Sequence, residues 1–326
     1  MKYRVIVAGF LVAAAGAAPA LAQCPTSAAD ACQKAADLLN YVTPQLSTSL
    51  VGGNTTLGQG GTLGGLGHFS IDVRGGLLNG SLPQIGNVPL DPSGKHSDAF
   101  TTKNQIIPSI SLDAGIGLWR GMSLGITHVG GVDAIITMTY LPSLKSNGTT
   151  STGSFTVQGS NEKFGFGFRL GLLEESLTTP GVSFTWAERD LPVVDFAGTV
   201  QAGGTNPGGT LALNDFAVKT SAWRLTAGKS FLIFGLSAGY GQDHYTSTST
   251  INATINGPFG GSGSQAANFA MTRSNYFVGL SINVIAFKIE GEYGAVTGGT
   301  DATFNTFSPV ATKSRSYATL GLRFGI

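Results

Sequence analysis

Apolar and polar residues alternate with a period of two along most of the chain after residue 67. The segment from Lys163 to Leu173 shows this most clearly, with Phe or Leu at positions 164, 166, 168, 170 and 172 and mostly Gly between them. Residues 315–326 repeat the pattern, with Arg323 on the face opposite Phe324. Successive side chains of a strand point to opposite faces, so the period predicts strands with one apolar face.

Twelve segments with this period are expected to form strands: Gly67–Leu78, Gln105–Leu118, Met122–Val129, Val132–Leu141, Ser151–Gly159, Lys163–Leu173, Thr179–Glu188, Phe216–Gly228, Phe231–His244, Met271–Val284, Ala286–Val296 and Arg315–Ile326. The stretch 191–213 leaves room for a further hairpin. We therefore expect about 12 to 14 strands, an even number that returns both chain ends to one side of a sheet.

The expected connections alternate between short and long. Tight corners fall at 119–121, 228–230 and 284–286, whereas 79–104, 190–215, 245–270 and 297–314 are long and rich in Gly, Ser, Thr and Asn. Aromatic residues gather near the expected strand ends, at Trp119, Tyr140, Trp186, Tyr240 and Tyr293. Short turns on one side, long loops on the other and aromatic girdles are typical of barrels in outer membranes.

Before the first expected strand the pattern is different. From Pro25 to about Thr43, apolar residues recur at alternating steps of four and three, which predicts one short amphipathic helix that ends near Pro44. The following stretch, 48–67, consists mainly of Gly, Ser, Thr and Leu. It is either a flexible linker or a segment folded into the barrel as a plug.

Residues 1–22 are typical of a secretory signal peptide. Lys2 and Arg4 precede an apolar run that ends on Ala20-Leu21-Ala22, a cleavage-type tripeptide, and a retained membrane anchor is the alternative. A lipid-modified Cys24 is a further alternative, although Gln23 stands where a small residue is expected. Cys24 and Cys32 are the two cysteines of the chain, and in an exported protein such a pair predicts one disulfide.

The composition favours a surface that faces lipid. Charged residues make up 11% of the chain where about 25% is usual, and Gly supplies 48 of 326 residues. Beyond the signal peptide, no stretch has the roughly 18 apolar residues that a membrane helix needs, which leaves a closed barrel as the way to span lipid. A net charge of +1 gives no electrostatic footprint for nucleic acid. The predicted fold class is all-β, an antiparallel transmembrane β-barrel, and a soluble exported β-sandwich is the alternative.

These features together resemble the Gram-negative outer-membrane β-barrels of unassigned function, and more loosely the long-chain fatty-acid transporter barrels. The resemblance covers most of the chain and rests on the leader, the N-terminal helix, the Gly-rich stretch, the strands and the closing segment from Ser316 to Ile326. It implies outer-membrane lipid and the outer-membrane assembly machinery as partners. Such barrels usually end on Phe or Trp, whereas position 326 is Ile. The expected division is 1–22 signal peptide, 23–66 helical and Gly-rich segment, and 67–326 barrel.

The sequence predicts no metal site, no cofactor and no catalytic residues. His68, His96, His128 and His244 lack metal-ligand spacing. Ser123 lies five residues before His128 and Asp243 directly precedes His244, but neither arrangement provides a nucleophile, a base and an orienting group on one strand face. We therefore expect the protein not to be an enzyme.

The candidate functional residues are charges on the small or polar faces of the strands. If the apolar faces meet lipid, these charges line the lumen: Asp72, Arg74, Asp113, Asp133, Arg169, Arg224, Lys288, Glu290, Glu292 and Arg323. Charges of both signs can pair and make a closed lumen rigid, which we favour over a role in ion selectivity.

Two functions follow from this pattern. The first is passive transport of small, and by the resemblance hydrophobic, molecules whose identity the sequence does not give. The second is a structural outer-membrane protein with a closed lumen that displays its long loops.

Overall fold

The computed structural model describes residues 24–86, 88–141, 153–284, 287–300 and 303–325, so the predicted signal peptide and the 284–286 corner lie at least partly outside it. The elements are α1 (Thr26–Val51), β1 (Phe69–Pro83), β2 (Ala99–Trp119), β3 (Met122–Leu124), β4 (Thr127–Val129), β5 (Gly131–Tyr140), β6 (Gly153–Val157), β7 (Glu162–Leu173), β8 (Gly181–Asp190), β9 (Val194–Val200), β10 (Gly209–Phe231), β11 (Phe234–Ile255), β12 (Ser262–Val284), β13 (Phe287–Thr297), β14 (Thr306–Ser308) and β15 (Arg315–Gly325).

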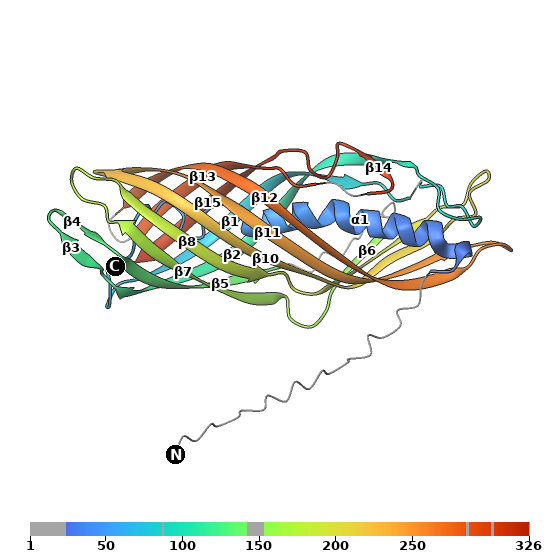
Figure 1. Ribbon diagram of the computed structural model, residues 1–326, viewed down its shortest axis with the longest axis horizontal. Helices are drawn as coiled ribbons and strands as arrows, with labels where there is room; N and C mark the ends of the chain where they lie inside the picture. The colour runs from blue at the N-terminus through green and yellow to red at the C-terminus, as the bar shows by residue number, and fades with distance from the viewer. Residues whose placement is uncertain (1–23, 87, 142–152, 285–286, 301–302, 326) are drawn as a thin grey trace, which may run out of the picture.

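The strands build a closed antiparallel barrel (Figure 1). Within the described residues one sheet holds 13 strands, which confirms the fold class and the expected number of about 12 to 14. Its wall closes as a ring in the order β1, β2, β5, β7, β8, β10, β11, β12, β13 and β15, and β15 pairs back with β1 from Ser70↔Gly325 to Leu78↔Tyr317. A closed ring leaves no unpaired edge, as a sheet in lipid requires.

The two ends of the barrel differ. We call the end with the β3–β4 hairpin, the turn between β10 and β11 and the close of β15 the short-turn end. At the opposite, long-strand end, β10, β11 and β12 extend well beyond their neighbours, with 23, 22 and 23 residues (Figure 1). There β9 pairs with β10 beyond the end of β8, and β6 pairs with β9.

Several expected loops are in fact strands. The stretch 245–270 was predicted as a long loop, but β11 runs to Ile255 and β12 starts at Ser262. Stretch 190–215 likewise contains β9 and the start of β10, which pair as the further hairpin for which residues 191–213 leave room. The reason is that Ser and Thr alternate here with buried residues such as Ile251 and Ala253, and Thr favours extended backbone.

Two predicted elements have other bounds. Met122–Val129 is a separate two-stranded hairpin, β3 paired with β4, and not a strand of the wall. The helix does not end near Pro44 but continues to Val51. Thr43 and Thr48 donate hydrogen bonds to carbonyls four residues earlier, at Leu39 and Pro44. Because this stretch is enclosed by the barrel, leaving its backbone without partners would cost more than keeping a proline in the helix.

The helix α1 lies inside the ring (Figure 1). Its side chains contact inward residues of strands on different sides of the wall: Thr43 bonds Ser247 on β11 at 3.0 Å, and Gln45 accepts the backbone N–H of Ser81 on β1 at 2.7 Å. Both partners are buried. The inside of the long-strand end is therefore occupied by helix.

Candidate functional site: the filled lumen

The charges predicted for the lumen lie on the inward face of the wall. All of them are buried except Lys288, whose side chain is 18% exposed. Eight of the ten pair with one another, in three groups. Arg169 bonds Asp133 at 2.6 Å; Arg74 bonds Asp113 at 2.9 Å; and Arg323 lies between Asp72 and Glu290 at 3.3 and 3.1 Å, with Lys288 3.5 Å from Glu290.

Two buried charges outside the predicted set, Asp243 and Arg189, pair with members of it. Arg224 pairs with Asp243 at 2.5 Å, and Arg189 lies 3.3 Å from Asp113. Arg189 is on β8 and Asp113 on β2, which β5 and β7 separate in the ring, so this ion pair spans the lumen. The sequence could have placed Arg189 in the lumen, because it has the same strand parity as the buried Ser183 and Thr185. The charged Glu188 and Asp190 on either side obscure this alternation.

Residues 52–66, which we call the inner segment, thread the lumen from the end of α1 to the short-turn end. Its backbone, rather than its side chains, makes many of the contacts. Arg74 donates to the carbonyl of Asn54 at 2.8 Å, and the N–H of Asn54 donates to Glu292 at 3.0 Å. Lys288 donates to the carbonyl of Gly58 at 2.8 Å. The wall charges thus satisfy backbone groups that would otherwise be buried without partners.

Further along, the inner segment meets the opposite part of the wall. Arg169 donates to Gln59 at 2.5 Å, and the N–H of Leu63 donates to Asp133 at 3.1 Å, so both members of the Arg169–Asp133 pair also hold this segment. The N–H of Thr62 donates to Glu174 at 2.9 Å, a residue that sequence reasoning missed because it follows β7 in a turn. The inner segment is therefore tied to wall charges at several points between Asn54 and Leu63.

Glycine is required where the inner segment touches the wall. A Cβ at Gly60 would lie 2.4 Å from the backbone nitrogen of Gly228 and 2.7 Å from the carbonyl oxygen of Gly181. Gly65 has φ +96°, and a Cβ there would lie 2.8 Å from the backbone of Arg120. The Gly-rich composition thus reflects close backbone packing rather than a free linker.

The long-strand end is filled differently, by an apolar core. Leu38 and Leu39 of α1 pack with buried side chains of β9, β10 and β11, among them Val200 and Ile251. Tyr41 stacks on Phe307 with ring centroids 4.3 Å apart. A disulfide joins Cys24 to Cys32 at the start of the helix, where Cys24 lies against Gly263 of β12.

On the outer face of the wall the apolar and polar ends are exchanged relative to the lumen. Near the short-turn end it is apolar, and on β11 the outward residues are Phe234, Leu236, Ala238 and Tyr240. Beyond Tyr240 they are Gln242, His244 and a series of Thr and Asn. The change coincides with a row of outward aromatic rings across neighbouring strands: Phe166, Trp186, Phe168, Phe184, Trp223, Tyr240 and Tyr276, linked by centroid distances of 5.0 to 6.4 Å.

An apolar belt below an aromatic girdle, on a closed antiparallel barrel, is the exterior of an outer-membrane protein. The protein is an outer-membrane β-barrel. The belt faces lipid, and the polar outer face of the long-strand end faces water. Among the described residues, no helix combines the length and hydropathy needed to cross a membrane.

The histidines weighed for catalysis are placed as follows. His244 faces outward and lies 2.9 Å from the hydroxyl of Thr272, whereas Asp243 faces the lumen and pairs with Arg224. Ser123 and His128 face each other across the β3–β4 hairpin. Over the described ranges, His, Cys, Asp and Glu side chains form no group of three or more suited to a metal ion.

No protein-family model and no curated protein matches the chain. Solved structures that resemble it include the outer-membrane protease OmpT of Escherichia coli, at 14% identity and TM-score 0.36 over 84% of this chain and 100% of that one. The toluene transporter TodX of Pseudomonas putida gives 13% and 0.31 over 79% and 88%, and the attachment invasion locus protein Ail of Yersinia pestis gives 10% and 0.28 over 79% and 99%. TM-scores this low carry no conclusion about function.

Proposed function

We propose that the protein is a closed outer-membrane barrel that holds its long-strand end outside the bilayer as a rigid platform. The observation that carries the proposal is the filling of the lumen from end to end, by α1 and then by the inner segment. In this proposal residues 23–66 are a plug, residues 67–326 are the barrel, and the outer-membrane assembly machinery inserts it.

The two halves of the plug are held by different forces. Around α1 the contacts are apolar, and moving the helix would expose side chains such as Leu39 and Ile251, both fully buried, to water. Around the inner segment they are charged hydrogen bonds. A solute crossing the barrel would have to displace both, which favours a platform over an open pore.

Gated passive transport is the second candidate, and the polar contacts of the inner segment support it. If this segment left the lumen, water could solvate the wall charges, including Arg74 and Glu292, so withdrawal costs less than it would from an apolar core. The lumen would then suit a small polar solute. A hydrophobic cargo, which the resemblance to long-chain fatty-acid transporters implies, fits these charged walls less well.

An epitope tag between Gly257 and Pro258, in the β11–β12 loop, tests the platform. Because short turns of such barrels face the periplasm, we expect antibody to bind this tag on intact cells. A matched tag between Gly125 and Ile126, at the short-turn end, should be reached only after permeabilisation. A Gly257 tag that stays hidden on intact cells would contradict the platform. Current steps from the unmodified protein in planar bilayers would favour transport instead.

A further inference from the structure

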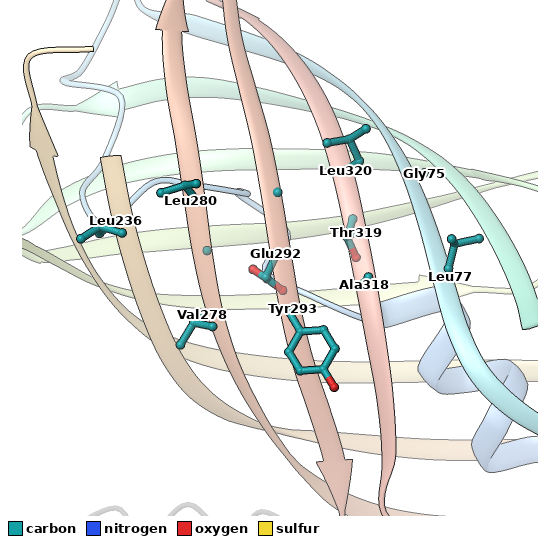
Figure 2. Close-up of a pocket in the computed structure, with 12 residues that line it drawn as sticks. Gly75, Leu77, Leu236, Val278, Leu280, Glu292, Tyr293, Ala318, Thr319 and Leu320 are labelled. Atoms are coloured by element: carbon teal, nitrogen blue, oxygen red, sulfur yellow. The ribbon is translucent and has the colours of Figure 1, made fainter. Parts of the chain in front are cut away.

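A groove of about 600 Å³ lies on the lipid-facing side of the wall, over β11, β12, β13, β15 and β1 (Figure 2). Large apolar side chains form its rims, and Figure 2 shows Leu77 on one side and Val278 and Leu280 on the other, with Tyr293 below. The polar residues in its lining, Glu292 and Thr319, belong to the inward face and are only 4% and 6% exposed.

The strand register explains why the wall is hollow here. Gly291 on β13 pairs with Leu280 on one side and with Leu320 on the other. Gly75 on β1 pairs with the same Leu320 on β15 and, on its other side, with Ile110 on β2. A Cβ at Gly75 or Gly291 would meet no atom within 4 Å. Each glycine therefore leaves an open slot beside a large outward side chain.

A third slot lies one row further toward the girdle. Ala318 on β15 pairs with Tyr293 and with Leu77, both large and outward. Since Ala318 sits between the strands of Gly291 and Gly75, the three small residues join into a single oblique groove across β13, β15 and β1. The rims protrude, and Leu320 and Val278 are 64% and 60% exposed.

The position of the groove in the bilayer indicates which kind of ligand it binds. Val278 is two residues below Tyr276 of the girdle, so the groove begins just inside the girdle and runs through the lipid-facing belt. From β12 to β1 it crosses three strand spacings, about 14 Å at roughly 4.8 Å each. A groove inside the girdle lies among lipid tails, and an acyl chain that enters it follows a path oblique to the bilayer normal, because the groove crosses tilted strands. We propose that this groove binds one acyl chain of a membrane lipid.

Native mass spectrometry of the detergent-solubilised protein with added palmitoyl-oleoyl phosphatidylglycerol tests the site. The unmodified barrel should retain one lipid that survives detergent exchange. The double variant Gly75→Phe/Gly291→Phe fills two slots, and we expect it to lower the retained fraction about tenfold, because the chain loses its contacts with the slot walls. Heat-dependent gel mobility verifies that the variant is folded.

Ala134→Phe is the matched control. Ala134 also faces outward, on β5, between Ile116 and Phe168; β2 separates this strand from β1, and no residue of β2 or β5 lines the groove. It adds a ring to the belt without entering the groove, so its lipid retention should equal that of the unmodified protein. Equal retention by all three proteins would overturn the site. So would a dimer of the unmodified barrel that the double variant abolishes, because the groove would then face a second copy.

Discussion

Replacing Arg169 by Met is expected to destabilise the barrel by about 3 to 5 kcal/mol, because the Asp133 carboxylate would remain buried without its partner. Both side chains are almost completely buried, and the guanidinium lies 2.6 Å from the carboxylate. Arg169 also donates to Gln59, so the inner segment loses a contact as well. Urea unfolding in lipid vesicles, followed by the folded gel mobility, measures the loss.

Two controls distinguish the effect of an unpaired buried charge on stability from the effect of removing any cation. The double variant Arg169→Met/Asp133→Leu removes both charges and should recover most of the lost stability, although the N–H of Leu63 then lacks its acceptor. Lys95→Met removes an exposed cation and should change stability by less than about 0.5 kcal/mol. If Arg169→Met behaved like Lys95→Met, the lumen pairs would not support the barrel.

Deletion of residues 24–66 is expected to convert a sealed barrel into one that conducts ions in planar bilayers. The whole plug must be removed, because α1 ends at Val51 within the lumen while β1 starts at the short-turn end, and a shorter deletion would pull the helix along the lumen. The exposed wall charges would then be hydrated, as in barrels with polar interiors.

The matched control deletes residues 257–260 in the β11–β12 loop, which leaves the plug in place and should leave the barrel sealed. Both variants are compared only in preparations that show the folded gel mobility. A plug-deleted barrel that is folded yet carries no current would mean that the wall itself closes the lumen. The plug would then not be the seal in either of the two proposed functions.

The alternation of side chains along each strand, its parity, is enough to predict much of the fold. Because side chains alternate, the apolar positions of β7 are enough to assign Arg169 to the opposite face, and the same argument places Arg323 on the face opposite the apolar residues of β15. Parity says nothing, however, about which strands meet across the lumen. The contact of Arg189 with Asp113 depends on the closed ring and could not be read from either segment.

The strands at the long-strand end could not be predicted from the sequence for a different reason. The pattern of apolar residues outward and polar residues inward holds only inside the bilayer. Along β11 the rule inverts after Tyr240, so that Ile251 and Ile255 face inward and Thr248 faces water. A strand that passes from lipid into water must change its pattern, and without the girdle as a reference the second half resembles a loop.

The apolar belt also sets the bilayer thickness that this barrel matches. On β11 the outward apolar residues run from Phe234 to Tyr240, about 20 Å along the strand, or about 15 Å of height at a tilt near 40°. On β2 they run from Ile106 to Leu118, about 40 Å along the strand and about 30 Å of height. Lipid should therefore be thinner beside β11 than beside β2, so the bilayer around the molecule has no single thickness.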